Sequence, residues 1–139
     1  MRVADLLRKK GSSVVTLPSS ATVIELLDTL DDNKIGAVVV VDQDQVVGIV
    51  SERDVVHHLR GGADTSAPVS TLMTTEVNLC GPDDDLTDLA VRMTEARHRH
   101  MPVVRDGSLQ GIVSIGDVVK ARLDALEAER DALENYLRQ

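Results

Sequence analysis

The chain of 139 residues contains no phenylalanine and no tryptophan, and Tyr136 is its only aromatic residue. Its core must therefore be built from aliphatic side chains and methionine, and no aromatic platform exists on which nucleic-acid bases could stack. A net charge of -8 also opposes binding to a polyanion. We therefore expect no nucleic-acid partner.

Cysteine and long apolar runs are also scarce. Cys80 is the single cysteine, so the chain forms no internal disulfide, which fits a reducing cytoplasm. No apolar run approaches the roughly 20 residues that span a bilayer, and the first residues do not resemble a signal peptide. We expect a cytoplasmic protein with no membrane partner, and a length that suits one compact domain.

What the sequence does contain is a repeat. Residues 48–56, GIVSERDVV, return 63 positions later as residues 111–119, GIVSIGDVV. Apolar positions upstream of both segments keep the same spacing. Two copies of a unit that cannot bury its own apolar faces pack on each other and leave paired, symmetry-related clefts. These clefts are the expected place of function.

Each repeat is predicted to run strand, helix, strand, strand, helix. The first copy has strands at 14–17, 37–41 and 46–50 and helices from Thr22 and from Ser51; the second has strands at 76–79, 101–104 and 109–113, with helices over 85–97 and from 115. A helix over 1–10 precedes the first copy. Residues 61–68, rich in Gly, Ser and Pro, are the predicted linker.

The last helix is predicted to continue to the end of the chain. Its apolar residues alternate at spacings of four and three, with Arg130 in one apolar-phase position: Val119, Leu123, Leu126, Leu133 and Leu137. One interpretation is a dimerising helix. The alternative is a helix that folds back over its own core.

The repeated block ends in Ser-x-x-Asp, as Ser51 to Asp54 and as Ser114 to Asp117. At a helix start this pattern is a capping box, in which serine and aspartate satisfy backbone N–H groups and nothing else need be involved. The functional alternative is that the helix N-terminus favours phosphate while the carboxylate accepts the two hydroxyls of a ribose. Gly48 precedes the first block and also permits a planar base or another backbone to approach closely.

Catalysis is not expected. Ser51 and Ser114 have no histidine in their own motifs and Cys80 stands alone, so we predict no enzyme, no catalytic residue and no catalytic cofactor. A dedicated metal site is not expected either, because His98 and His100 share a strand face but no second cysteine or carboxylate cluster completes a ligand set.

The duplicated unit, with GIVSERD at 48–54, GIVSIGD at 111–117 and MPVV at 101–104, resembles a cystathionine β-synthase (CBS) domain pair over roughly Val3 to Val119. The resemblance implies an α/β (α+β) fold of two tandem repeats about a pseudo-two-fold axis, each with a small sheet and two packed helices. It divides the chain into repeat 1 (1–60, with the N-terminal helix), the linker (61–68), repeat 2 (69–119) and a helical extension (120–139).

The resemblance also implies two clefts that bind adenosine ligands such as AMP, ADP, ATP, NAD(H) or S-adenosylmethionine. The motif aspartate would take the ribose hydroxyls, the serine would reach phosphate, and the opposite repeat would help hold the adenine. Carried over, one cleft uses Ile49, Ser51, Arg53 and Asp54 with Val77, Asn78, Arg99, His100 and Met101. The other uses Ile112, Ser114 and Asp117 with Val15, Thr16, Gly36, Ala37 and Val38.

The two clefts are not expected to be equal. Arg53 corresponds to Gly116, and RHRH at 97–100 corresponds to KIGA at 34–37. Extra basic groups in an acidic chain suit phosphate recognition, although cations at a helix end also complement the helix dipole. His100 can face either cleft. We expect unequal affinities, with one site occupied and one empty as the extreme case.

The function expected from these observations is a regulatory module that senses an adenosine nucleotide, forms a homodimer and passes its output to a separate effector protein. The alternative is a structural dimerisation module whose Ser-x-x-Asp boxes only cap helices. The two differ in whether Asp54→Ala and Asp117→Ala abolish a nucleotide effect or merely lower stability.

Overall fold

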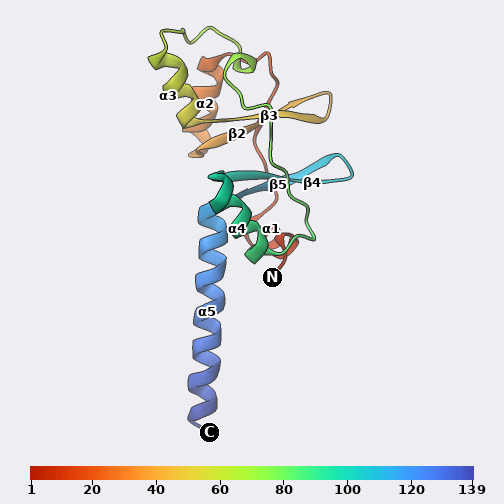
Figure 1. Ribbon diagram of the computed structural model, residues 1–139, viewed down its shortest axis with the longest axis vertical. Helices are drawn as coiled ribbons and strands as arrows, with labels where there is room; N and C mark the ends of the chain where they lie inside the picture. The colour runs from red at the N-terminus through yellow and green to blue at the C-terminus, as the bar shows by residue number, and fades with distance from the viewer.

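The computed structural model describes all of residues 1–139 and shows two stacked halves with a projecting C-terminal helix (Figure 1). Along the chain, residues 1–60 form α1 (Val3–Lys10), β1 (Thr16–Leu17), α2 (Val23–Asn33), β2 (Ala37–Asp42), β3 (Gln45–Ser51) and α3 (Glu52–Arg60). Residues 61–139 form the 3-10 turn η1 (Val69–Thr71), α4 (Leu86–Ala96), β4 (His100–Arg105), β5 (Ser108–Ser114) and α5 (Ile115–Leu137). The mixed α/β fold with a long last helix is confirmed.

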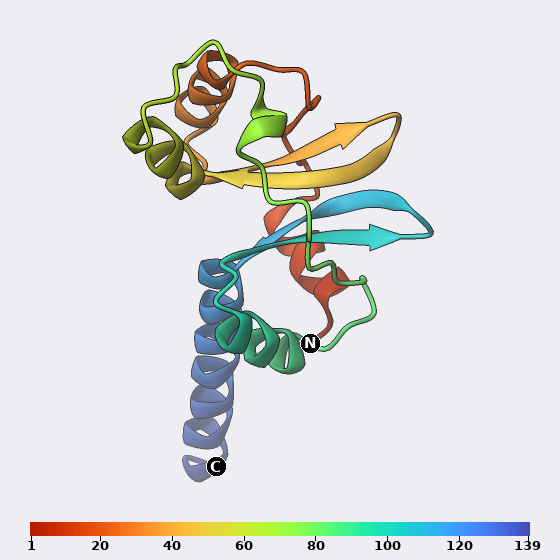
Figure 2. The same ribbon diagram turned by 45° about the horizontal axis from the view of Figure 1, so that its top comes forward.

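The two halves share one strand register. In the first sheet β1 lies parallel to β2, and β2 is antiparallel to β3 with Val40 opposite Gly48; in the second, β4 is antiparallel to β5 with Val103 opposite Gly111. Both hairpins shift register directly after these pairs. The hairpins lie one above the other in Figure 2, so the repeat of the sequence is also a repeat of structure.

Local chemistry explains where the elements begin and turn. Thr22 accepts a hydrogen bond from the Glu25 N–H at 3.2 Å and the Glu25 side chain accepts one from the Thr22 N–H at 3.3 Å, which completes the expected capping box of α2. Asp106 and Gly107 both have positive φ, 51° and 78°, as the two-residue turn of a tight hairpin requires. These predictions are confirmed.

The predicted strand over 76–79 is wrong. Only Cys80 pairs there, as an isolated parallel bridge to Val103, with the Cys80 N–H donating to the Pro102 carbonyl at 3.0 Å. To extend the ladder by one step, residue 102 would have to donate its N–H to the carbonyl of residue 78. Proline has no N–H, so the strand stops. Val39, which corresponds to Pro102 in the first repeat, has a backbone N–H to donate, and β1 forms there.

The hydrophobic core consists of two clusters, and each cluster includes side chains from a segment of the other repeat. Val3, Leu6 and Leu7 of α1 are buried with α4, β4 and α5 in the second half. Val69, which begins the segment that corresponds to α1, is buried with α2, β2 and β3 in the first half. The structure therefore places the N-terminal helix on repeat 2, whereas the sequence-based division groups it with repeat 1.

Only the start of α5 packs on the protein. Val118 and Ala121 are its buried residues, and every residue after position 125 is exposed. The alternative in which the helix folds back over its own core is therefore wrong. No helix of this chain combines the length and the apolar character that a membrane span requires.

Candidate functional site

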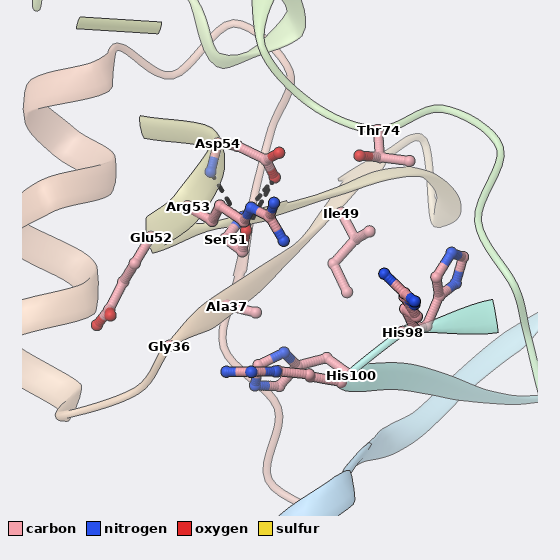
Figure 3. Close-up of a pocket in the computed structure, with 12 residues that line it drawn as sticks. Gly36, Ala37, Ile49, Ser51, Glu52, Arg53, Asp54, Thr74, His98 and His100 are labelled. Carbon is pink, nitrogen blue, oxygen red and sulfur yellow. Dashed lines mark hydrogen bonds between the residues drawn. The ribbon is translucent and has the colours of Figure 1, made fainter. Parts of the chain in front are cut away.

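A cavity of about 480 Å³ lies where the end of the first hairpin meets the entrance to β4 (Figure 3). Its volume falls within the roughly 300–1,000 Å³ of small-molecule sites. Of its twelve lining residues two are hydrophobic, so the cavity suits a polar ligand. The lining residues are Gly36, Ala37, Ile49, Ser51, Glu52, Arg53, Asp54, Thr74, Arg97, His98, Arg99 and His100.

Ser51 and Asp54 stand at the first turn of α3, directly after β3. The Ser51 N–H donates to Asp54 Oδ2 at 2.8 Å, the Ser51 hydroxyl donates to the same oxygen at 3.1 Å, and the Asp54 N–H donates to Ser51 Oγ at 3.4 Å. The capping box is thus complete. Because all of these bonds use Oδ2, the Oδ1 atom of this half-buried carboxylate accepts no hydrogen bond from the protein.

Three guanidinium groups line the same cavity. Arg53 comes from α3, whereas Arg97 and Arg99 come from the segment between α4 and β4 in the other half. None of them forms an ion pair within the chain, although six ion pairs form elsewhere. Only Glu52 and Asp54 supply negative charge to the lining, so unpaired cations outnumber carboxylates here in an otherwise acidic protein. An anionic ligand is favoured at such a place.

Two histidines form the far wall, opposite Arg53 and Asp54 in Figure 3. His98 shares a hydrogen bond with Asn78, whose Nδ2 lies 2.6 Å from His98 Nδ1. Burial lowers the pKa of His100 below its ordinary 6.5, and the nearby Asp117 opposes that effect only in part. His100 is therefore neutral at pH 7 and has one ring N–H to donate.

Ile49 and Thr74 close the remaining side. The Ile49 N–H donates to the Thr74 carbonyl at 3.0 Å, and the Thr74 N–H donates to the Ile49 carbonyl at 2.8 Å. The segment after η1 is thus paired with the outer edge of β3. Figure 3 shows the Ile49 side chain pointing into the cavity between the arginine and histidine walls. It offers an apolar surface for a base to pack against.

The second Ser-x-x-Asp box has a different environment. Ser114 and Asp117 form the same capping box, but Lys10 at the end of α1 donates from Nζ to Asp117 Oδ2 at 2.6 Å and to the Ile112 carbonyl at 2.7 Å. Burial, the largest influence, raises the pKa of Asp117, but the hydrogen bonds from Lys10 and Ser114 together outweigh it and the pKa lies below 3.8. The negative charge of Asp117 is therefore already balanced by Lys10.

Most residues assigned to the Asp54 cleft come together, namely Ile49, Ser51, Arg53, Asp54, Arg99 and His100. Asn78 reaches the cavity only through His98, and Val77 does not line it. Met101 is 1% exposed and is a core residue instead. A strand alternates its faces, so the residue after His100 points away from the cavity.

Gly36 and Ala37 need a correction. The resemblance assigns them to the Asp117 cleft, but both line the Asp54 cavity. The reason is strand pairing: Ala37 lies opposite Ser51, and the Glu52 N–H donates to the Gly36 carbonyl at 3.0 Å. Among the other residues assigned to the Asp117 cleft, Val38 is fully buried in the first core. The rest do not line the Asp54 cavity, namely Val15, Thr16, Ile112, Ser114 and Asp117.

The residues assigned to the two clefts omit four lining residues and one obstructing residue, although Arg97 and His98 belong to the basic segment that the sequence already connects with phosphate. The lining residues are Glu52, Thr74, Arg97 and His98. The obstructing residue is Lys10, which forms an ion pair with Asp117. Residues 69–73 resemble residues 3–7, so the sequence gives that segment a counterpart in the N-terminal helix, but nothing in it places the adjoining Thr74 in the cavity. Nothing local to Lys10 indicates its contact with Asp117, which lies 107 positions away. No group of three or more His, Cys, Asp or Glu is arranged to hold a metal ion.

The geometry agrees with what comparison with known proteins shows. The family model described as CBS domain matches residues 3–61 and again residues 69–124. The chain therefore belongs to the CBS-domain family and is a tandem pair of such domains.

Similar proteins share this architecture. A CBS-domain containing protein from Agrobacterium tumefaciens is 45% identical, with a TM-score of 0.83 over 88% of this chain and 99% of that one. The CBS domain-containing protein YhcV of Bacillus subtilis is 30% identical over 92% of this chain and 91% of its own length. A CBS domain protein of Pyrobaculum aerophilum, solved as a complex with AMP, is 28% identical, with a TM-score of 0.76 over 84% of this chain and 89% of that one.

Proposed function

We propose that this protein is a regulatory module that binds one phosphorylated adenosine ligand in the Asp54 cavity. The observation that carries the proposal is the set of three unpaired arginines, Arg53, Arg97 and Arg99, around a carboxylate with a free oxygen. The free Oδ1 of Asp54 is suited to ribose hydroxyls, and the guanidinium groups are suited to phosphate. The AMP complex of the Pyrobaculum aerophilum relative supports this choice.

The charge of the cavity narrows the ligand class. AMP, ADP, ATP and NAD(H) all carry phosphate groups that the three arginines would neutralise, whereas S-adenosylmethionine carries a sulfonium cation. The cationic ligand is therefore disfavoured. Adenosine alone would keep the ribose contact with Asp54 but leave the arginines unpaired, so it would bind more weakly than AMP.

Signalling would follow from a difference in affinity between two arrangements of the protein. The cavity takes its walls from both repeats, Arg53 from α3 and His100 from β4, so a ligand that bridges them changes the preferred angle between the halves. We propose that the protein acts as a homodimer and passes this change to a separate effector protein. Its role would then be regulatory and not catalytic.

A second candidate is a dimerisation module without a physiological nucleotide. Both capping boxes are complete, so Asp54 and Asp117 each have a structural role at a helix start. This candidate predicts that removing either acid lowers the stability of the protein by about 0.5–2 kcal/mol and alters no ligand response.

A thermal-shift screen distinguishes the two candidates. At 100 times Kd a ligand stabilises the folded state by about 2.7 kcal/mol, which raises the Tm of a chain of this size by roughly 5–10 °C. We expect that rise with AMP, ATP or NAD(H), its loss in Asp54→Ala, and its retention in Asp117→Ala. A panel of adenosine ligands that leaves the Tm of the wild type unchanged would favour the dimerisation module.

The phosphate contact has its own control. Arg53→Gln should weaken AMP more than adenosine, because only AMP loses a charged partner. Arg60→Gln is the matched variant, since Arg60 is an exposed residue of the same helix and does not line the cavity. Equal effects of the two substitutions on AMP binding would count against a specific phosphate site.

A further inference from the structure

The outer part of α5 is an amphipathic helix without a partner in its own chain. The helix has 23 residues, about 35 Å at 1.5 Å per residue. It projects from the body in Figure 1, and every residue after position 125 is exposed. Its large apolar side chains are exposed by 44–79%, namely Val119, Leu123, Leu126, Leu133 and Leu137. A lone helix of this kind is marginal in water, so its apolar stripe needs a covering surface.

The stripe itself indicates which surface covers it. Its spacings of four and three place Leu123, Arg130 and Leu137 at the heptad positions a, and Val119, Leu126 and Leu133 at positions d. When a second copy runs in the opposite direction with residue 128 at the centre, every stripe residue meets another. Val119 then faces Leu137 of the second copy, Leu123 faces Leu133, and Leu126 faces Arg130.

The charges beside the stripe fit the same alignment. Lys120 lies at an e position and meets Glu134 of the second copy, while Arg130 lies next to the second copy's Glu127. Each contact occurs twice because the pair is symmetric. Within its own chain Arg130 has only an exposed ion pair with Asp131 at 3.2 Å, and Lys120, Glu127 and Glu134 have none.

The sole aromatic residue also finds a role in this alignment. Tyr136 is 73% exposed and lies at a g position, where it meets Arg122 of the second copy. A guanidinium over a tyrosine ring is a favourable cation–π contact. Two contacts are unfavourable, since Glu127 and Glu129 each lie opposite their own counterparts, although the neighbouring Arg130 offsets the repulsion at Glu127.

A parallel pair fits the sequence less well. It would place the two copies of Arg130 against each other in the apolar seam, with no carboxylate between them. It would also set Glu129 against Glu134 of the second copy on both sides, where like charges repel. Its only attractive flanking contact is Arg122 with Glu127.

We propose that α5 pairs with α5 of a second copy of this chain as an antiparallel two-stranded coiled coil centred on residue 128. The two CBS bodies then lie at opposite ends of the paired helices. The inference gives a geometry to the homodimer of the proposed function, but it does not depend on nucleotide binding, so either can fail without the other.

Cysteine cross-linking tests the geometry directly. Leu123→Cys and Leu133→Cys combined in one chain should give a covalent dimer after oxidation with diamide, because each new thiol faces the other across the antiparallel pair. Each single variant should give none, because like positions lie about 15 Å apart along the axis at 1.5 Å per residue. The native Cys80 is 5% exposed and burial raises the pKa of its thiol to about 11, so it does not compete.

A covalent dimer of either single variant would overturn the proposal in favour of a parallel pair. Failure of the double variant to form a covalent dimer would also overturn it. Both results are read on the full chain by non-reducing electrophoresis, without any nucleotide present.

A charge substitution gives a second test with opposite signs for the two geometries. Glu134→Lys places a lysine against Lys120 in the antiparallel pair and should raise the dimer dissociation constant by about 2- to 20-fold, with recovery in the double variant Lys120→Glu, Glu134→Lys. In a parallel pair the same substitution would meet Glu129 and tighten the dimer. Sedimentation equilibrium measures the constant, and tighter association of Glu134→Lys would overturn the proposal.

Discussion

At the scale of single residues, the two motif acids occupy the same position of the repeated Ser-x-x-Asp box but lie in different environments. Both carboxylates accept hydrogen bonds only through Oδ2, but Asp54 lies beside three unpaired arginines, whereas Asp117 is bonded to Lys10 at 2.6 Å. Lys10 and Asp117 are only 29% and 28% exposed, so water screens their attraction less than that of an ordinary surface pair. Lys10 therefore adds to the difference between the two sites that Arg53 and the basic residues 97–100 already create.

Replacing Lys10 should expose the second site. In Lys10→Met the Asp117 carboxylate loses its charged partner, and we expect a second binding event for adenosine in isothermal titration calorimetry. It should be weaker than the first for AMP, because Gly116 stands where the first site has Arg53. Lys9→Met is the control, since Lys9 is exposed and has no ion pair. A single binding event in Lys10→Met would show that Lys10 does not close the site.

At the scale of elements, the motif glycines serve packing between segments. From the sequence, either a planar base or another backbone segment could approach Gly48 closely. In the structure the neighbours are Met73 and the backbone of Thr74. A Cβ on Gly48 would lie 2.7 Å from Met73 Sδ and 3.0 Å from the Thr74 carbonyl. At Gly111 it would lie 2.9 Å from Leu7. Each strand thus needs a glycine because the segment exchanged between repeats crosses it.

Gly48→Ala should therefore destabilise the protein. The added methyl group meets Met73 and the backbone of Thr74, and overpacking of this kind typically costs about 1–3 kcal/mol of unfolding free energy. Gly61→Ala is the matched control, because its nearest neighbour would lie at 3.4 Å and its φ is -73°. Urea denaturation followed by circular dichroism measures both, and equal midpoints for the two variants would contradict the packing account.

Most elements were predictable because their determinants are local. Capping boxes at Thr22, Ser51 and Ser114 and the Asp106–Gly107 turn fix helix starts and a hairpin within a few residues. The strand expected at 76–79 failed because its formation depends on a donor in another strand, and Pro102 has none. Pairing between distant segments depends on both of them and cannot be predicted from either segment alone.

At the scale of the whole molecule, the exchanged segments join the two repeats into one body. The N–H groups of Val3 and Ala4 donate to the carbonyls of Asp84 and Pro82 at 2.9 and 2.8 Å, so α1 is bonded to the second half. The Val69 N–H donates to the Ala21 carbonyl at 2.7 Å, so η1 is bonded to the first. Neither repeat completes its core without the other.

Leu6→Ala tests this exchange. Leu6 is 5% exposed in the second core, and its truncation should cost about 2–5 kcal/mol of unfolding free energy. Amide hydrogen exchange should then quicken first in α4 and at the start of α5, with β2 and β3 affected less. Leu59→Ala in α3, where the side chain is 40% exposed, should cost less than Leu6→Ala. Earlier loss of protection in α2 than in α4 would contradict the exchange.

The candidate site was predictable in part for the same reason. The motif residues Ser51, Arg53 and Asp54 lie close together in the repeated segment, so the repeat identifies them. The resemblance to CBS pairs added Arg99 and His100 from the other half. The contacts made by Lys10 and the place of Gly36 required the three-dimensional packing of the repeats. Sequence thus identifies the chemistry of the site, while packing decides which of the two copies is open.

A crystal structure of the protein with the phosphorylated adenosine ligand that the thermal-shift screen selects would show directly which of the two motif acids binds it. We expect one ligand per chain in the Asp54 cavity, with ribose hydroxyls on Asp54, phosphate on arginines from both repeats, and Lys10 still bonded to Asp117. A ligand bound through Asp117, with the Asp54 cavity empty, would contradict it.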